Sequence, residues 1–236
     1  MPKNPQGRKQ DTPEQSPGED KPERSSPLGD VTAAGPETGP SAAPEDFFKL
    51  LQEVFVVLRN RFPTLFPTQP LPAGKVGPEV PFDPEITQRL FVAAAAQGNS
   101  GVQIWTKDDS ELLVSTGQVK VTLDDGLVLV TIPVSCVEDS SATVQVPFAV
   151  GGKETPAGMV AATEERPRGP DLVVNIWGEA LTAFAWQTFL MILTEVAAQS
   201  GVDQDGAGLI PAAITAGADG LQILTMARQA FDRVRQ

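Results

Sequence analysis

Apolar residues return every three or four positions between Glu45 and Phe62, which is the period of an α-helix with one apolar side. The residues on that side are Phe47, Leu51, Val54, Phe55, Leu58 and Phe62. Pro63 ends the pattern, because proline cannot continue a helix. The sequence therefore predicts an amphipathic helix over 45–62.

The next segment is dense in proline. Seven prolines occur between positions 63 and 84: Pro63, Pro67, Pro70, Pro72, Pro78, Pro81 and Pro84. Such a density favours an extended, semi-rigid connector, so we expect a Pro-rich linker at 63–83. A second helix is predicted directly after it, because Asp83 can act as its N-cap and Pro84 suits the first helical position.

Apolar and polar residues alternate over much of 101–177, which is typical of β-strands. Asp125-Gly126 predicts a hairpin in which Val121 faces Val130 and Leu123 faces Val128. These facing pairs are all apolar, so the register is consistent with one buried face. Further strands are predicted near 102–107, 112–116, 143–150, 158–163 and 171–177.

The period becomes helical again after Gly178. A long helix is predicted at 179–200, followed by a Gly-rich loop and a last helix at 219–234. The fold class is thus α+β: an antiparallel β-meander of about five to seven strands packed against long C-terminal helices. Residues 1–44 contain a single Leu and a single Val, so we expect a disordered acidic arm there and a globular domain at 84–236.

Composition excludes several classes of function. The 236 residues include no His and one Cys, and 18 basic against 30 acidic side chains give a net charge of -12. A Ser-His-Asp triad, a His metal ligand, an intramolecular disulfide and a thiolate zinc site are therefore all excluded within one chain. The negative charge repels phosphate backbones, so we expect no nucleic-acid partner. We also expect no cofactor.

The apolar run from Ala180 to Thr194 bears on membrane association. It is fifteen residues long, whereas a membrane span needs about 20 apolar residues, and Glu179 and Glu195 flank it. We therefore expect a buried core helix and no membrane insertion. No apolar segment follows the basic residues near the N-terminus, and a disulfide cannot form within the chain, so we expect a cytoplasmic location.

Two groups of carboxylates are candidate metal ligands. Asp203 and Asp205 occupy positions one and three of a calcium-loop pattern, although the fifth and twelfth positions of that pattern lack an oxygen ligand. Asp108 and Asp124 each belong to an acidic pair at a predicted turn, and an up-and-down meander would bring the two turns to the same end of the sheet. In both cases the alternative is a solvated turn without a metal.

The 45–62 helix carries the main functional hypothesis. Its apolar side suits either docking on its own domain or binding to a partner. The 179–200 helix adds more apolar surface than one sheet face can cover. We therefore predict a non-enzymatic assembly or adaptor protein that associates with itself or with a protein partner through apolar helical surfaces. The alternatives are a carboxylate- or metal-dependent enzyme and a small-molecule-binding regulatory domain.

Overall fold

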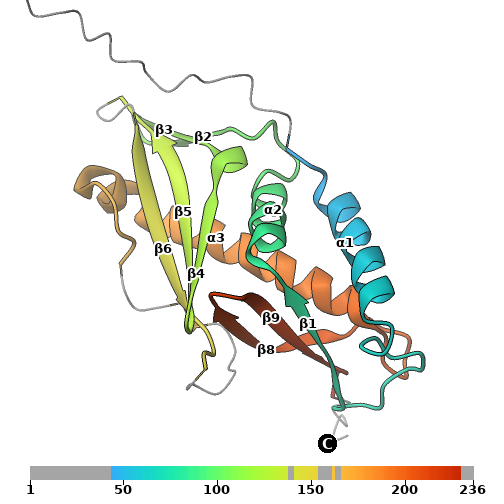
Figure 1. Cartoon of the computed structure of the whole chain (residues 1–236). Helices are drawn as coiled ribbons and strands as arrows, with labels where there is room; N and C mark the ends of the chain where they lie inside the picture. The colour runs from blue at the N-terminus through green and yellow to red at the C-terminus, as the bar shows by residue number, and fades with distance from the viewer. Residues whose placement is uncertain (1–43, 138–140, 154–160, 163–165, 230–236) are drawn as a thin grey trace, which may run out of the picture. The chain divides into compact units, whose positions relative to one another are not determined.

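A computed structural model describes residues 44–137, 141–153, 161–162 and 166–229, so the arm expected at 1–44 lies outside the described residues apart from Pro44. Within the described ranges the helices and strands follow one another as drawn in Figure 1. They are α1 (Phe47–Arg61), β1 (Val76–Phe82), α2 (Pro84–Ala95), β2 (Gln103–Lys107), β3 (Ser110–Val114), the 3-10 helix η1 (Thr116–Gln118), β4 (Lys120–Asp124), β5 (Leu127–Ser135), β6 (Ala142–Ala149), β7 (Ala161–Ala162), α3 (Asp171–Ser200), β8 (Ile210–Gly217) and β9 (Gly220–Met226).

The strands form two antiparallel sheets, which confirms the predicted α+β class. One sheet has the order β2-β3-β5-β6-β7, with β4 also paired to β5, and the other has the order β1-β9-β8. The predicted hairpin register is confirmed, since Val121 pairs with Val130 and Leu123 pairs with Val128. Asp83 is the N-cap of α2, and Pro84 opens that helix, as predicted.

The larger sheet is not a simple meander. β4 pairs with the first half of β5, while β3 pairs with its last residues, Val134 and Ser135. β3 and β4 therefore follow each other along the same edge of β5, joined by η1. Pro133 lies between the two stretches of pairing, and its carbonyl accepts a hydrogen bond from the Ser115 N–H (3.0 Å). Proline is tolerated within this central strand because its missing N–H falls where pairing is interrupted.

Two secondary-structure predictions in the C-terminal third are wrong. The predicted helix at 219–234 is replaced by strand β9 up to Met226, and residues 230–236 lie outside the described residues. The predicted strand at 171–177 is instead the first two turns of α3. β9 lies between β1 and β8. Its buried residues alternate with less buried ones, because successive side chains point to opposite faces of the sheet and one face packs on α3.

The prolines of 63–83 do not form a linker throughout. Val76–Phe82 is strand β1, which pairs with β9 at the edge of the smaller sheet. An edge strand accommodates proline, since one side of it needs no N–H donors. The Thr225 hydroxyl also donates a hydrogen bond to the Pro78 carbonyl (2.9 Å). Residues 76–82 are thus part of the globular core.

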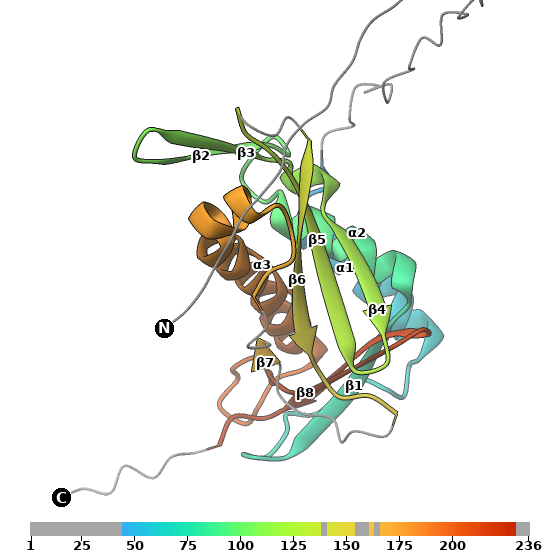
Figure 2. The same ribbon diagram turned by 90° about the vertical axis from the view of Figure 1, so that its left-hand side faces the viewer.

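α3 joins the two sheets. It contacts α2, β6, β1, β8 and β9, and Figure 2 shows it running beside the larger sheet. At its centre the ring of Phe189 lies 5.3 Å from that of Phe91 in α2 and 5.5 Å from that of Phe148 in β6. Among the described helices, α3 also has the length and apolar composition to span a bilayer.

A side chain closes part of the free edge of β4. The Gln88 amide of α2 donates to the Val119 carbonyl (2.7 Å) and accepts from the Val121 N–H (2.8 Å). The two hydrogen bonds replace those that a neighbouring strand would make. α2 is thereby fixed against the larger sheet.

Gly220, the first residue of β9 after the turn at 218–219, has no room for a side chain, so Gly220→Ala tests this packing. A Cβ there would lie 2.0 Å from the Phe82 carbonyl oxygen, and the backbone has a φ of +134°. We expect Gly220→Ala to lower the free energy of unfolding by at least about 2 kcal/mol. Gly217→Ala is the matched control, because no atom lies within 4 Å of its Cβ position. Equal melting temperatures for the two variants would contradict this account.

A second prediction concerns Gln88. Gln88→Met keeps the length of the side chain but leaves the Val119 carbonyl and the Val121 N–H without these partners. We expect a loss of about 1–3 kcal/mol in the free energy of unfolding. Gln97→Met is the control, since Gln97 is exposed beyond the end of α2. Chemical denaturation of the two variants checks the difference, and an unchanged Gln88 variant would refute it.

Candidate functional site

The apolar side of α1 is docked on its own domain. Of the six candidate partner-binding residues, five are buried in the hydrophobic core, and Phe62 at the C-terminal end is 36% exposed. The five are Phe47, Leu51, Val54, Phe55 and Leu58. α1 packs against α2, and the Arg59 guanidinium donates a hydrogen bond to the Gln199 carbonyl near the end of α3 (2.8 Å). The sequence left two alternatives for the apolar side of this helix, docking on its own domain or binding to a partner. In the structure this side is docked on its own domain.

A groove of about 710 Å³ remains open beside α1, and we call it the α1 groove. One wall is α1; the others are the end of β1, the start of α2, Lys153 and the β8–β9 turn. The apolar lining residues are Leu50, Val54, Val57, Leu58, Phe62, Pro81, Phe82, Ile86, Ala216 and Leu221. Val57 is 62% exposed, so it offers its side chain at the opening rather than to the core.

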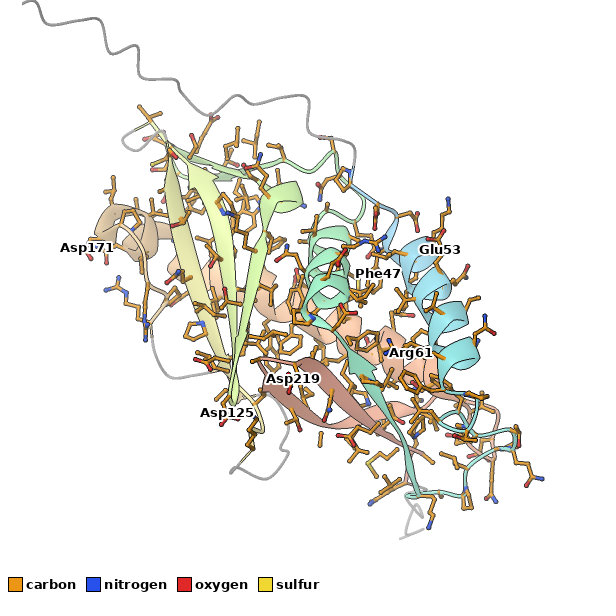
Figure 3. All side chains as sticks on the ribbon, in the orientation of Figure 1. Phe47, Glu53, Arg61, Asp125, Asp171 and Asp219 are labelled. Carbon is orange, nitrogen blue, oxygen red and sulfur yellow. The ribbon has the colours of Figure 1, made fainter. Side chains whose placement is uncertain are left out.

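Charged residues of both signs surround the apolar lining. They are Glu53, Arg61, Asp83, Arg89, Lys153 and Asp219; Figure 3 labels Glu53 and Arg61 on α1 and Asp219 at the β8–β9 turn.

Some of these charges already have partners. The Asp83 carboxylate accepts the Ile86 N–H (2.8 Å), and Arg89 pairs with Glu45 (3.1 Å). The Arg61 guanidinium lies 5.2 Å from the centre of the Phe62 ring.

A second cleft, of about 970 Å³, lies between β2 and the first half of α3. Its lining is more polar and includes Lys107, Asn175, Glu179 and Thr182. Lys107 donates a hydrogen bond to the Ile176 carbonyl (3.3 Å), which ties β2 to α3 across this cleft. One side of the cleft adjoins residues 163–165, which the structure does not describe, so the α1 groove is the better defined of the two sites.

The predicted calcium loop does not present its carboxylates to a cation. Asp203 is only 4% exposed, and its Oδ1 accepts the N–H groups of Asp205 (3.0 Å) and Ala207 (2.9 Å). The loop leads into strand β8 rather than into a helix, and Asp205 is exposed. Asp203 therefore stabilises the turn through backbone hydrogen bonds.

Asp108 and Asp124 lie toward opposite ends of β5, so the expectation that the two acidic turns share one end of the sheet is wrong. Asp108 follows β2 beyond the C-terminal end of β5, whereas Asp124 pairs with Leu127 at its start. The two turns are roughly 25 Å or more apart, at about 3.3 Å per residue along β5. Over the described ranges, no group of three or more potential metal-ligating side chains comes together.

The enzyme alternative gains little from the arrangement of the charged groups. An enzyme that used the Glu195 carboxylate together with Lys153 or Arg166 would need these groups in one cleft. Lys153 lines the α1 groove and Arg166 lines the second cleft, but Glu195 of α3 lines neither. The ion pair of Arg89 and Glu45 is exposed. The α1 groove is therefore suited to binding an apolar group, with charged residues around it to orient that group.

Comparison with protein-family models, with curated proteins and with solved structures finds no match to this chain.

The apolar pattern of α1 predicts only one wall of the groove. Its other walls come from Pro81 and Phe82 of β1 and from the β8–β9 turn. Asp219-Gly220 is a dipeptide typical of hairpin turns, but the two residues of the β8–β9 turn are Ala218 and Asp219, because Gly217 pairs with Gly220. The dipeptide thus indicates a turn in this region, one residue away from where the structure has it. Leu221 and Leu224 also fit a helical spacing, which led to the wrong prediction there.

The hydrogen bonds of Asp203 give a test of the loop. We expect Asp203→Ala to lower the free energy of unfolding by about 1–3 kcal/mol, because two backbone N–H groups lose their acceptor. Asp205→Ala should be nearly neutral. Melting temperatures measured with and without millimolar calcium provide the readout. A calcium-dependent stabilisation of the native chain that Asp203→Ala abolishes would restore the metal hypothesis.

Proposed function

We propose that this chain is a non-enzymatic assembly or adaptor protein that binds a protein partner through the α1 groove. The observation that carries the proposal is an apolar groove of about 710 Å³ next to the exposed side chains of Val57 and Phe62. Partner-binding surfaces commonly combine an apolar centre with a polar rim. The groove has this composition, with charges of both signs around its apolar lining.

Exposed apolar residues also gather on α1 itself. Phe48, Val56, Val57 and Phe62 all keep a third or more of their surface exposed, although the helix already buries one apolar side. A helix that only covers the core does not require valine or phenylalanine at these positions. Their presence supports a second role for α1, which is to contribute its outer residues to an interface.

A small apolar ligand is the second candidate occupant of the same groove. The volume of about 710 Å³ falls within the range of roughly 300–1,000 Å³ that is common for ligand pockets. The lining supplies apolar walls and a few charged groups, which such sites also use. A protein partner is favoured because the groove is open along α1 and the most exposed of its large apolar residues, Val57, lies at the opening.

Site-specific photo-crosslinking tests the proposal. A photo-crosslinking amino acid at Val57 should give a discrete protein adduct, both in native cells and with the purified full chain plus its partner. Val76 is the matched control, because it is a valine of similar exposure (56% against 62%) that does not line the groove. Phe62→Asp should reduce the adduct at Val57 several-fold while leaving the melting temperature nearly unchanged.

Adducts of equal yield at Val57 and Val76, or an adduct indifferent to Phe62→Asp, would contradict a groove-mediated interface. Native mass spectrometry of the chain purified from its own cells distinguishes the second candidate. A small molecule of defined mass that co-purifies with the native chain, but not with the Phe62→Asp variant, would indicate a ligand pocket instead.

A further inference from the structure

Three evenly spaced residues on the groove side of α1 place opposite charges on either side of an apolar residue. Glu53, Val57 and Arg61 are spaced four residues apart, and all three line the α1 groove. At about 1.5 Å of rise per residue, Glu53 and Arg61 lie about 12 Å apart along the helix, with Val57 midway between them. Along the helix, the strip of Glu53, Val57 and Arg61 therefore has a negative charge, an apolar side chain and a positive charge, in that order.

The strip is complementary to itself when the helix direction is reversed. If a second α1 lies antiparallel with its Val57 opposite the first Val57, each Glu53 faces the Arg61 of the other copy. Both ion pairs then have opposite signs, and the two valines meet at the centre. Such an arrangement has two-fold symmetry, which is the commonest symmetry of protein dimers.

We propose that the partner in the α1 groove is a second copy of this chain, bound through antiparallel pairing of the two α1 helices. The proposal rests on the proposed function, and it identifies the occupant of the same groove. Val57 and Phe62 of each copy would cover apolar lining of the other copy, and the two pairs of Glu53 with Arg61 would fix the register.

Both charged groups are available for such pairing. Among the described residues, neither Glu53 nor Arg61 takes part in an ion pair. Both side chains are exposed. Arg61 lies over the ring of Phe62, and this contact restricts the guanidinium before a partner arrives.

Charge complementarity favours a second copy over an arbitrary apolar partner. Each chain carries a net charge of -12, so two copies repel each other in general. A specific contact between them therefore needs a place where opposite charges face each other. The strip of Glu53, Val57 and Arg61 has no net charge and becomes attractive only in the antiparallel register. A parallel register would place like charges opposite each other, which selects against it.

The size of the interface adds a constraint. A stable dimer usually buries about 1,200–2,000 Å² in total. One face of a fifteen-residue helix is small beside that area. The β8–β9 turn and the end of β1, which form the opposite wall of the groove, would therefore also contact the second copy.

Charge reversal in the full chain tests the proposal. Sedimentation velocity at about 0.1 M salt should detect a dimer of the native chain. Glu53→Arg alone and Arg61→Glu alone should each weaken dimerisation at least about tenfold, because each puts like charges at both ends of the strip. An equimolar mixture of the two variants should recover the native affinity to within about threefold, since every facing pair is then of opposite sign.

Glu111→Arg is the matched control, because Glu111 is exposed on β3 and does not line the groove. It makes the same change in net charge as Glu53→Arg, and the dimer should keep its affinity. Melting temperatures of all three variants, each expected within a few degrees of the native value, exclude a loss of folding as the cause.

A native chain that stays monomeric up to about 100 µM, or a dimer that neither reversal weakens, overturns the proposal. So does a mixture that fails to recover affinity. The photo-crosslink at Val57 separates this failure from that of the proposed function. An adduct with a different protein would leave the groove as an interface and remove only the second copy, whereas no specific adduct at all would remove both.

Discussion

The contact of Phe189 with Phe91 and Phe148 is the centre on which the rest of the structure depends. It brings one helix into contact with α2 and with the larger sheet, and the same helix continues onto the smaller sheet. Each sheet has an apolar face that is stable only when covered. α3 contributes to that cover for both, which explains why so much of its surface is apolar.

The α1 groove follows from the way the outer elements pack on this centre. α2 packs on α3, and α1 packs on α2. Just after the β8–β9 turn, Gly220 at the start of β9 lies so close to β1 that a side chain there would collide with the Phe82 carbonyl. α1 and the β8–β9 turn are thus held apart by rigid neighbours, and the space between them stays open. A groove formed in this way is largely present before anything binds.

Secondary structure was predicted correctly where the apolar residues fitted only one period, that of a strand or that of a helix. It was predicted wrongly where the same residues fitted both periods. The 121–124 and 127–130 hairpin followed from alternation and an Asp-Gly turn, and α2 followed from Asp83 and Pro84. Leu221 and Leu224, in contrast, satisfy both a strand and a helix period, and only pairing with β1 and β8 decides between them. The groove needed tertiary packing, because its walls come from segments more than 150 residues apart.

The Gln88 amide gives the larger sheet a property that its strands alone would lack. The Gln88 amide donates one hydrogen bond and accepts another, as a peptide group in a strand does, so α2 occupies the position that an additional strand would take beside β4. Open strand edges are the places where separate molecules join into fibrils. Along this stretch a single side chain blocks that route, which protects the molecule against amyloid-like stacking without lengthening the chain.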